Sequence, residues 1–226
     1  MEFITTVLRF FQNGGPFMYP IALVLVVGVA VALERWLYLT HAKSANRKAF
    51  QQLMPLLKKR DYAGVMKLGQ TSNAPIARII SAGVARMSQS QRRDDIELAM
   101  EEGVMEAMPR LEKRTPYLAT LANIATLLGL LGTIIGLIAA FTAVADADPA
   151  EKANLLSASI SVAMNTTAFG LMSAIPLLLF HATLQTKTTE IIDSLEMAGV
   201  KCLNLMGVGT AQRASGKPGS EPSAQA

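Results

Sequence analysis

The chain has 226 residues, of which 51% are hydrophobic, 17% charged and 6% aromatic. This composition is too apolar for an ordinary soluble domain, and it excludes a disordered chain and a basic nucleic-acid-binding arm. The formal net charge is only +4, and the single cysteine, Cys202, excludes an internal disulfide and a cysteine-based metal site.

The first segment of the chain is predicted to sit at a membrane. Residues 1–15 carry Phe3, Val7 and Phe11 among other apolar side chains at helical spacing, which predicts a short amphipathic helix lying in the interface. An uncharged apolar run then covers residues 17–33. Because about 20 apolar residues span a bilayer, this run predicts a first transmembrane helix over residues 16–39.

Two longer uncharged runs follow later in the chain. They predict transmembrane helices over residues 115–145 and 153–186, joined by a short acidic loop at 146–152. At ~1.5 Å per residue, each run is longer than the ~30 Å hydrocarbon core requires. We therefore expect both helices to extend into water, the third through a cytoplasmic helical extension over 187–210. Residues 211–226 have a disordered composition rich in Gly, Ser, Pro, Gln and Ala.

The distribution of cations predicts the orientation. Of the 21 Lys and Arg residues, fifteen lie in residues 34–115 and four lie after residue 182. Positively charged segments remain on the cytoplasmic side of a membrane. The sequence therefore predicts a multi-pass membrane protein whose amino terminus faces the outside and whose carboxyl terminus is cytoplasmic.

The large cytoplasmic loop, residues 40–114, is predicted to form a helical domain interrupted at Pro55, Gly64, Gly69 and Pro75. It contains an acidic stretch, for which a solvated helix face is the favoured interpretation and a partner or cation site is the alternative. The acidic residues are Asp94, Asp95, Glu97, Glu101, Glu102 and Glu106.

Small and hydroxyl side chains recur at spacings of three and four along the second and third spans. Because helices in lipid associate through small and polar residues, these stripes predict close helix packing, with Gly129, Gly136 and Gly170 as packing positions. The alternative is that part of each stripe lines a polar conduit. Its candidate residues are Asn123, Thr126, Thr133, Ser159, Thr166 and Thr167.

The centres of the three spans contain no Asp, Glu, Lys or Arg. A proton relay through a membrane ordinarily needs an ionisable group, so the chain cannot carry protons by itself and a second polypeptide would have to supply the acid. The sequence also lacks a phosphate-binding loop, a metal-binding spacing and a credible catalytic triad. We therefore expect neither an enzyme nor a cofactor or metal.

Three motifs resemble the ExbB, TolQ and MotA family of proton-channel subunits, and ExbB most of all. Residues 14–20 have the sequence GGPFMYP, residues 127–137 have LLGLLGTIIGL and residues 165–176 have NTTAFGLMSAIP. The resemblance extends from Gly14 to about Gly207 and includes three spans with a large cytoplasmic loop in the family's order.

The resemblance implies an all-α homopentameric ring in the bacterial inner membrane, with a periplasmic amino terminus and a cytoplasmic carboxyl terminus. The second and third spans of the ring would enclose a pore. An ExbD-like partner within that pore would carry the titrating Asp, and a TonB-like protein would transmit the work to outer-membrane receptors. Thr133 and Thr167 match the family's pore threonines, and Pro176 matches a proline that bends the third span. Cations near the inner ends of the spans, such as Arg35 and Lys187, would favour anionic phospholipid.

One residue departs from the family pattern, because Val162 stands where well-known ExbB chains have a Glu. The scarcity of other oxygen ligands favours H⁺ over Na⁺ as the transported ion. The functional hypothesis is an ion-channel subunit that energises TonB-dependent uptake. The alternatives are a TolQ-like role in envelope integrity, a non-conducting membrane scaffold, and an enzyme or transporter with its site in the loop.

Overall fold

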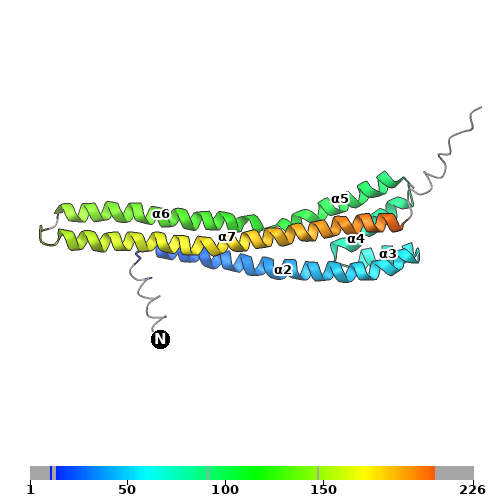
Figure 1. Cartoon of the computed structure of the whole chain (residues 1–226), viewed down its shortest axis with the longest axis horizontal. Helices are drawn as coiled ribbons and strands as arrows, with labels where there is room; N and C mark the ends of the chain where they lie inside the picture. The colour runs from blue at the N-terminus through cyan, green and yellow to red at the C-terminus, as the bar shows by residue number, and fades with distance from the viewer. Residues whose placement is uncertain (1–10, 12–13, 91, 147, 207–226) are drawn as a thin grey trace, which may run out of the picture. The chain divides into compact units, whose positions relative to one another are not determined.

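The computed structural model describes residues 11, 14–90, 92–146 and 148–206. Most of the predicted amino-terminal helix at 1–15, and the whole predicted tail at 211–226, lie outside the described residues. Every regular element in the described part is a helix (Figure 1). These helices are α2 (Met18–Lys58), α3 (Tyr62–Thr71), α4 (Pro75–Met87), α5 (Arg93–Glu112), α6 (Thr115–Asp146) and α7 (Lys152–Leu205).

Three helical stretches are long and apolar enough to cross a membrane. They are Met18–Lys58, Arg93–Ala145, which contains α5 and most of α6, and Lys152–Leu205. The prediction of an all-α membrane protein with three spans is therefore confirmed. The homo-oligomeric ring remains a prediction, since a single chain is described.

The chain divides into two compact units. We call residues 1–38 and 112–187 the membrane unit, and residues 39–111 and 188–226 the loop unit. The helices α2 and α7 each contribute residues to both units. Each unit therefore contains one part of α2 and one part of α7.

The membrane unit has its large apolar side chains on the outside. Leu127, Ile138 and Leu179 are each more than 60% exposed, whereas Ala125 and Ala163 are buried between helices. In water such a surface would aggregate, but in a bilayer the acyl chains cover it. The surface of the membrane unit is therefore suited to a lipid bilayer.

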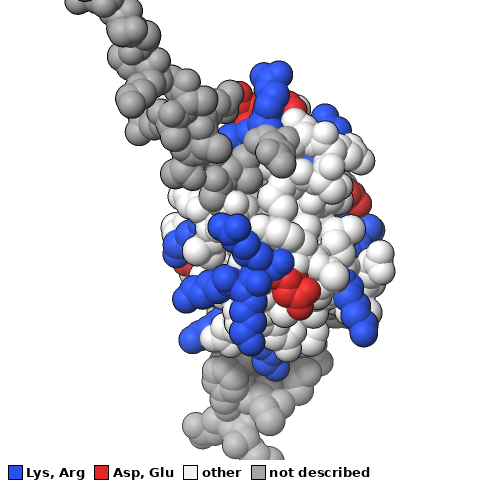
Figure 2. Space-filling model, turned by 90° about the vertical axis from the view of Figure 1, so that its right-hand side faces the viewer, with Lys and Arg blue, Asp and Glu red and all other residues white. Residues whose placement is uncertain are grey.

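The loop unit has the reverse pattern. Its core is made of large aliphatic side chains, and Ile76, Ile79, Ile80 and Ile96 are each at most 1% exposed. Lys and Arg side chains lie on the outer surface of this part of the molecule, as Figure 2 shows. This arrangement of an apolar core under a charged surface is that of a helical domain in water.

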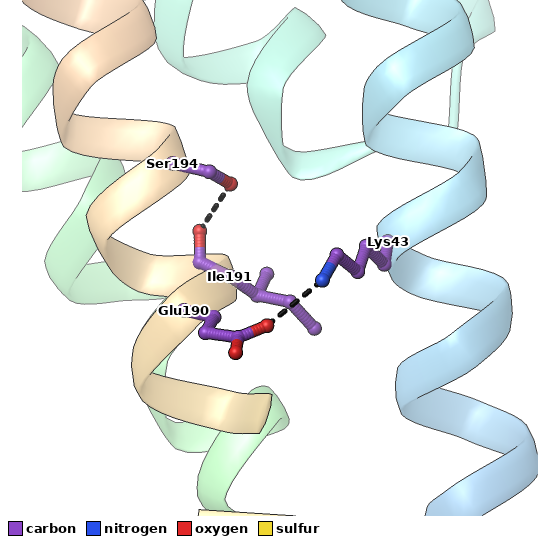
Figure 3. Close-up of polar contacts among 4 residues, drawn as sticks. All are labelled: Lys43, Glu190, Ile191 and Ser194. Carbon is purple, nitrogen blue, oxygen red and sulfur yellow. Dashed lines mark hydrogen bonds and ion pairs between the residues drawn. The ribbon is translucent and has the colours of Figure 1, made fainter. Parts of the chain in front are cut away.

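Two polar contacts join helices within the loop unit. The buried Asn46 of α2 accepts the Ile76 N–H with its Oδ1 at 3.2 Å. This bond satisfies a donor in the first turn of α4, where the capping residue Ala74 has no side-chain oxygen. Lys43 of α2 donates to Glu190 of α7 at 2.8 Å (Figure 3).

Some helix boundaries differ from the expected ones. The helix of the first span does not stop near residue 39, because the following residues are good helix formers and α2 continues to Lys58. Pro55 lies inside α2, and Gly64 lies inside α3. The expected break at Pro75 is present, because α4 begins there. The breaks between α2 and α3 and between α5 and α6 contain Arg60 and Arg114, which adopt positive φ angles of 57° and 66° although neither is a glycine.

Candidate functional site

The candidate site begins where α6 and α7 touch backbone to backbone in the membrane unit. A Cβ atom added to Gly170 would lie 2.8 Å from the Ala125 carbonyl oxygen and 3.0 Å from the Gly129 Cα. A Cβ on Gly136 would lie 3.0 Å from the Cβ of Ala163. Only glycine permits so close an approach of two helix backbones, and this approach brings short hydroxyl side chains of the two helices within reach of each other.

Thr133 of α6 and Thr167 of α7 lie together beside this glycine contact. Their Oγ1 atoms are 3.3 Å apart. The Thr167 hydroxyl donates to the Gly129 carbonyl oxygen at 2.8 Å, and the Thr133 hydroxyl donates to the Leu130 carbonyl oxygen at 2.6 Å. Both side chains are half-buried. The structure thus brings together the two residues that the motifs singled out.

The chemistry of this pair follows from the number of its protons. Each hydroxyl has one proton, and the shorter bonds direct both protons to the backbone carbonyls of Gly129 and Leu130. The two Oγ1 atoms then face each other with lone pairs that accept a hydrogen bond. Thr133 and Thr167 can therefore accept a hydrogen bond from a donor such as a carboxylic acid or a water molecule. A threonine hydroxyl does not ionise in the pH range of water, so neither residue can carry a charge.

Thr166, the neighbour of Thr167, has a different environment. It is 2% exposed, and its hydroxyl lies 2.6 Å from the Gly14 carbonyl oxygen and 2.9 Å from the Val162 carbonyl oxygen. The structure therefore places Thr166 against the segment that precedes α2. The sequence analysis missed this contact, because no local signal joins residues so far apart in the chain.

A cavity of about 250 Å³ lies beside Thr166. Ser159 and Val162 of α7 and Gly132 and Gly136 of α6 contribute to its wall. Among the described residues that line the cavity there is no carboxylate. Val162, at the position of the family Glu, thus faces an uncharged space within the membrane unit.

The other candidate residues lie away from the threonine pair. Asn123 and Thr126 are on an exposed part of α6, and the Thr126 hydroxyl donates back to the Ala122 carbonyl oxygen at 3.1 Å. Pro176 is half-buried inside the unbroken helix α7. The described chain does not bring these residues into contact with Thr133.

Cations and aromatic rings meet at one end of the membrane unit. The Lys187 ammonium lies 3.1 Å from the centre of the Trp36 ring, and the Arg35 guanidinium lies 4.8 Å from the centre of the Tyr38 ring. Arg114 pairs with Glu34 at 2.7 Å. Trp and Tyr beside Lys and Arg are typical of the boundary between hydrocarbon and water.

No cluster of three metal-binding side chains occurs among the described residues. The side chains of the candidate site are hydroxyls, glycines and aliphatic groups, which offer neither a metal ligand set nor a catalytic nucleophile with its base. The arrangement fits the passage or acceptance of a proton, with the acid supplied by another molecule.

The chain resembles known membrane transport proteins. A family model described as "MotA/TolQ/ExbB proton channel family" matches residues 71–197. The chain is 31% identical to a protein of Methanothermobacter thermautotrophicus described as a biopolymer transport protein ExbB homolog, over 87% of this chain and 69% of that relative. It is 27% identical to the biopolymer transport protein ExbB-like 3 of Synechocystis, over 74% and 79%.

The chain is also similar to proteins described as TolQ. The Tol-Pal system protein TolQ of Pseudomonas aeruginosa is 26% identical over 76% of this chain and 81% of its own length. The matched region of the family model contains Thr133 and Thr167 and both helices that carry them. The hydroxyl pair is therefore part of the region that the family shares.

Proposed function

The chain belongs to the MotA/TolQ/ExbB proton channel family, and we propose that it is the ring-forming subunit of a motor energised by the proton-motive force. In this proposal, an ExbD-like partner inserts transmembrane helices into a pore enclosed by α6 and α7 of several copies, most simply five. The complex drives a TonB-like protein that powers uptake across the outer membrane. The chain itself is a subunit of the inner membrane, and its family consists of transport subunits and is not a known enzyme family.

The observation that carries the proposal is the Thr133–Thr167 pair in spans that have no acid of their own. The partner's carboxyl group, when protonated, donates a hydrogen bond to one of the free lone pairs of the two Oγ1 atoms. When that group is ionised, the threonine hydroxyls can turn from their carbonyls and donate to it. The pair thereby stabilises both protonation states of an acid that moves past it.

Two further features support the orientation and the environment of the proposed ring. The excess of cations in residues 34–115 supports a cytoplasmic position for the loop unit. Lys187 beside Trp36 then lies at the inner interface, where anionic phospholipid binds cationic side chains. The absence of a carboxylate at Val162 leaves the partner as the source of the acid and favours H⁺ as the ion.

Substitution of the hydroxyls tests this proposal. Thr167→Val and Thr133→Val keep the side-chain shape and remove the hydroxyl, so we expect each variant to assemble with the co-expressed partner and to lose most proton flux in proteoliposomes. Thr142→Val is the matched control, because the Thr142 hydroxyl, like that of Thr133, donates within its own helix, at 2.9 Å to Ile138, but is not part of the Thr133–Thr167 pair. Normal flux in Thr167→Val with intact assembly would show that the hydroxyl pair is not part of the ion path. A wild-type complex that carries no proton flux, together with a Thr167→Val variant that retains full function in cells, would support the non-conducting scaffold instead.

The rival within the family is a TolQ-like role in envelope integrity, which the relative in Pseudomonas aeruginosa favours. Deletion of the gene separates the two roles. An ExbB-like subunit is required for growth on scarce iron complexes, whereas a TolQ-like subunit is required for resistance to detergents. Complementation with Thr167→Val should fail in whichever assay the wild-type gene restores.

A further inference from the structure

The loop unit contains a groove that the proposed ion path does not use. It lies between α5 and α7, has Ile79 of α4 in its wall, and has a volume of about 440 Å³. This volume is within the range of ~300–1,000 Å³ that ligand sites occupy. All of its lining residues belong to the loop unit.

The lining of the groove combines flexible apolar side chains with charge of one sign. Three methionines contribute to it, and Met105 is 65% exposed although it belongs to the unit that has a charged surface. Val200, on the α7 side, is 47% exposed. Methionine-rich grooves adapt to the apolar face of a helix from another protein, because the thioether side chain is flexible and polarisable.

The charged residues of the groove are all acidic. Glu97 and Glu101 of α5 and Glu196 of α7 line it, and no Lys or Arg is among its described lining residues. Arg93 approaches Glu97 at 3.9 Å, but no cation pairs with Glu101 or Glu196 among the residues that the structure describes. A groove with this chemistry is complementary to a helix that has an apolar face bordered by Lys or Arg.

This chain does not itself supply such a helix in the described part. The cationic stretch of α2 that contains Lys43 and Arg47 has its large apolar residues turned inward, with Leu53 and Leu57 at most 2% exposed. The carboxyl-terminal residues 207–226 include two cations but only one large aliphatic residue, Val208, and two prolines. Neither segment has the apolar face that the groove requires.

We propose that the groove lined by Met105, Glu101 and Glu196 is a docking site for a cationic amphipathic helix of another protein. The apolar face of that helix covers the methionines and Val200, and its cations pair with the glutamates at the rim. This docking is independent of the threonine pair, so it does not rest on the proposed function.

The proposal is tested with a defined probe and the full chain. The chain is placed in nanodiscs of zwitterionic lipid, which keep a cationic peptide from binding the bilayer through charge. The probe is a fluorescent peptide of about 18 residues with Leu on one helical face and Lys on the other, followed by fluorescence anisotropy. Empty nanodiscs and a peptide with Glu in place of Lys are the controls.

Matched variants locate the binding. We expect Met105→Glu to weaken peptide binding about tenfold or more and Glu101→Lys to weaken it several-fold. Leu98→Glu and Glu102→Lys are the matched controls, because both side chains are exposed on α5 and neither lines the groove. Both controls should bind within about twofold of wild type, and circular dichroism verifies that every variant is folded. Glu101→Gln replaces Glu101→Lys if the latter unfolds.

Several outcomes would overturn the proposal. They are equal affinity in Met105→Glu and Leu98→Glu, equal binding of the Glu peptide, and binding that empty nanodiscs reproduce. A second copy of the chain would be the occupant if the wild type binds no peptide and Met105→Glu lowers the number of copies in native mass spectrometry.

Discussion

The membrane unit and the loop unit use opposite means to hold their helices together. In the membrane unit, α6 and α7 meet through Gly129 and Gly170, hydroxyls lie at the contact, and large apolar side chains face outward. In the loop unit, large aliphatic side chains such as Ile80 fill the interior and charges face outward. The difference teaches that the surroundings decide which groups stabilise a helix contact, since expulsion of water acts only in the loop unit.

The largest expected effect comes from the same substitution made once in each unit. Ile80→Ala should lower the free energy of unfolding by about 2–5 kcal/mol, because it opens a cavity in a water-excluding core. Ile138→Ala removes a side chain that is 61% exposed on the membrane unit, and should lower the free energy of unfolding by much less. Unfolding in mixed micelles measures both values. Similar losses for the two variants would contradict the contrast between the units.

A smaller effect is expected from adding one methyl group at glycine. Gly170→Ala should destabilise the protein by about 1–3 kcal/mol, because the new Cβ meets the backbone of α6. In the loop unit, a Cβ on Gly199 would lie 3.6 Å from the Met100 Cε, an ordinary contact. Gly199→Ala should therefore stabilise α7 by about 0.5–1 kcal/mol through helix propensity. The same unfolding measurement compares Gly170→Ala with Gly199→Ala. If Gly170→Ala stabilises the protein, the backbones of α6 and α7 are not in close contact there.

The smallest effect concerns the buried thiol of the loop unit. Burial raises the pKa of Cys202 from 9.0 to about 12. The unfolded chain therefore loses this proton at lower pH than the folded chain, and stability falls as pH rises from about 9 towards 12 by up to ~1.4 kcal/mol per pH unit. Below pH 9 this thiol causes no pH dependence.

Comparison with Cys202→Ala isolates the contribution of the thiol. The wild type should lose more stability than Cys202→Ala between pH 8 and about 10, by roughly 1 kcal/mol. Alkylation of the folded wild type at pH 8 should also be slow until denaturant exposes the thiol. Identical pH profiles with fast alkylation would show that Cys202 is accessible.

The spans were predictable from the sequence because hydropathy reports directly on the solvent that surrounds a segment. The ends of the helices were harder to predict, since α2 continues to Lys58 through residues that are mostly polar. The breaks at Arg60 and Arg114 carry no glycine signal, although both residues have positive φ. Whether a segment is helical and whether it lies in the membrane are separate properties. The length of an uncharged run predicts only the part that lies in the membrane.

The sequence supplied candidate residues for the site, which stay a prediction, but it did not supply their contacts. The motifs identified Thr133 and Thr167, whereas the direction of each hydroxyl depends on how two helices meet. The Thr166 contact with Gly14 and the groove at Met105 join residues that are distant in the chain. Such contacts arise from tertiary packing and leave no periodic pattern in the sequence.

The continuity of α7 has a mechanical consequence. The helix runs without a break from Lys152 to Leu205, so a torsional force applied beside Thr167 would act on a helix that continues beyond it. Pro176 has no backbone N–H, so one of the hydrogen bonds within α7 is missing. The missing bond would join Pro176 to the carbonyl of Met172, so we expect α7 to twist most easily about 1.4 to 2.5 turns beyond Thr167.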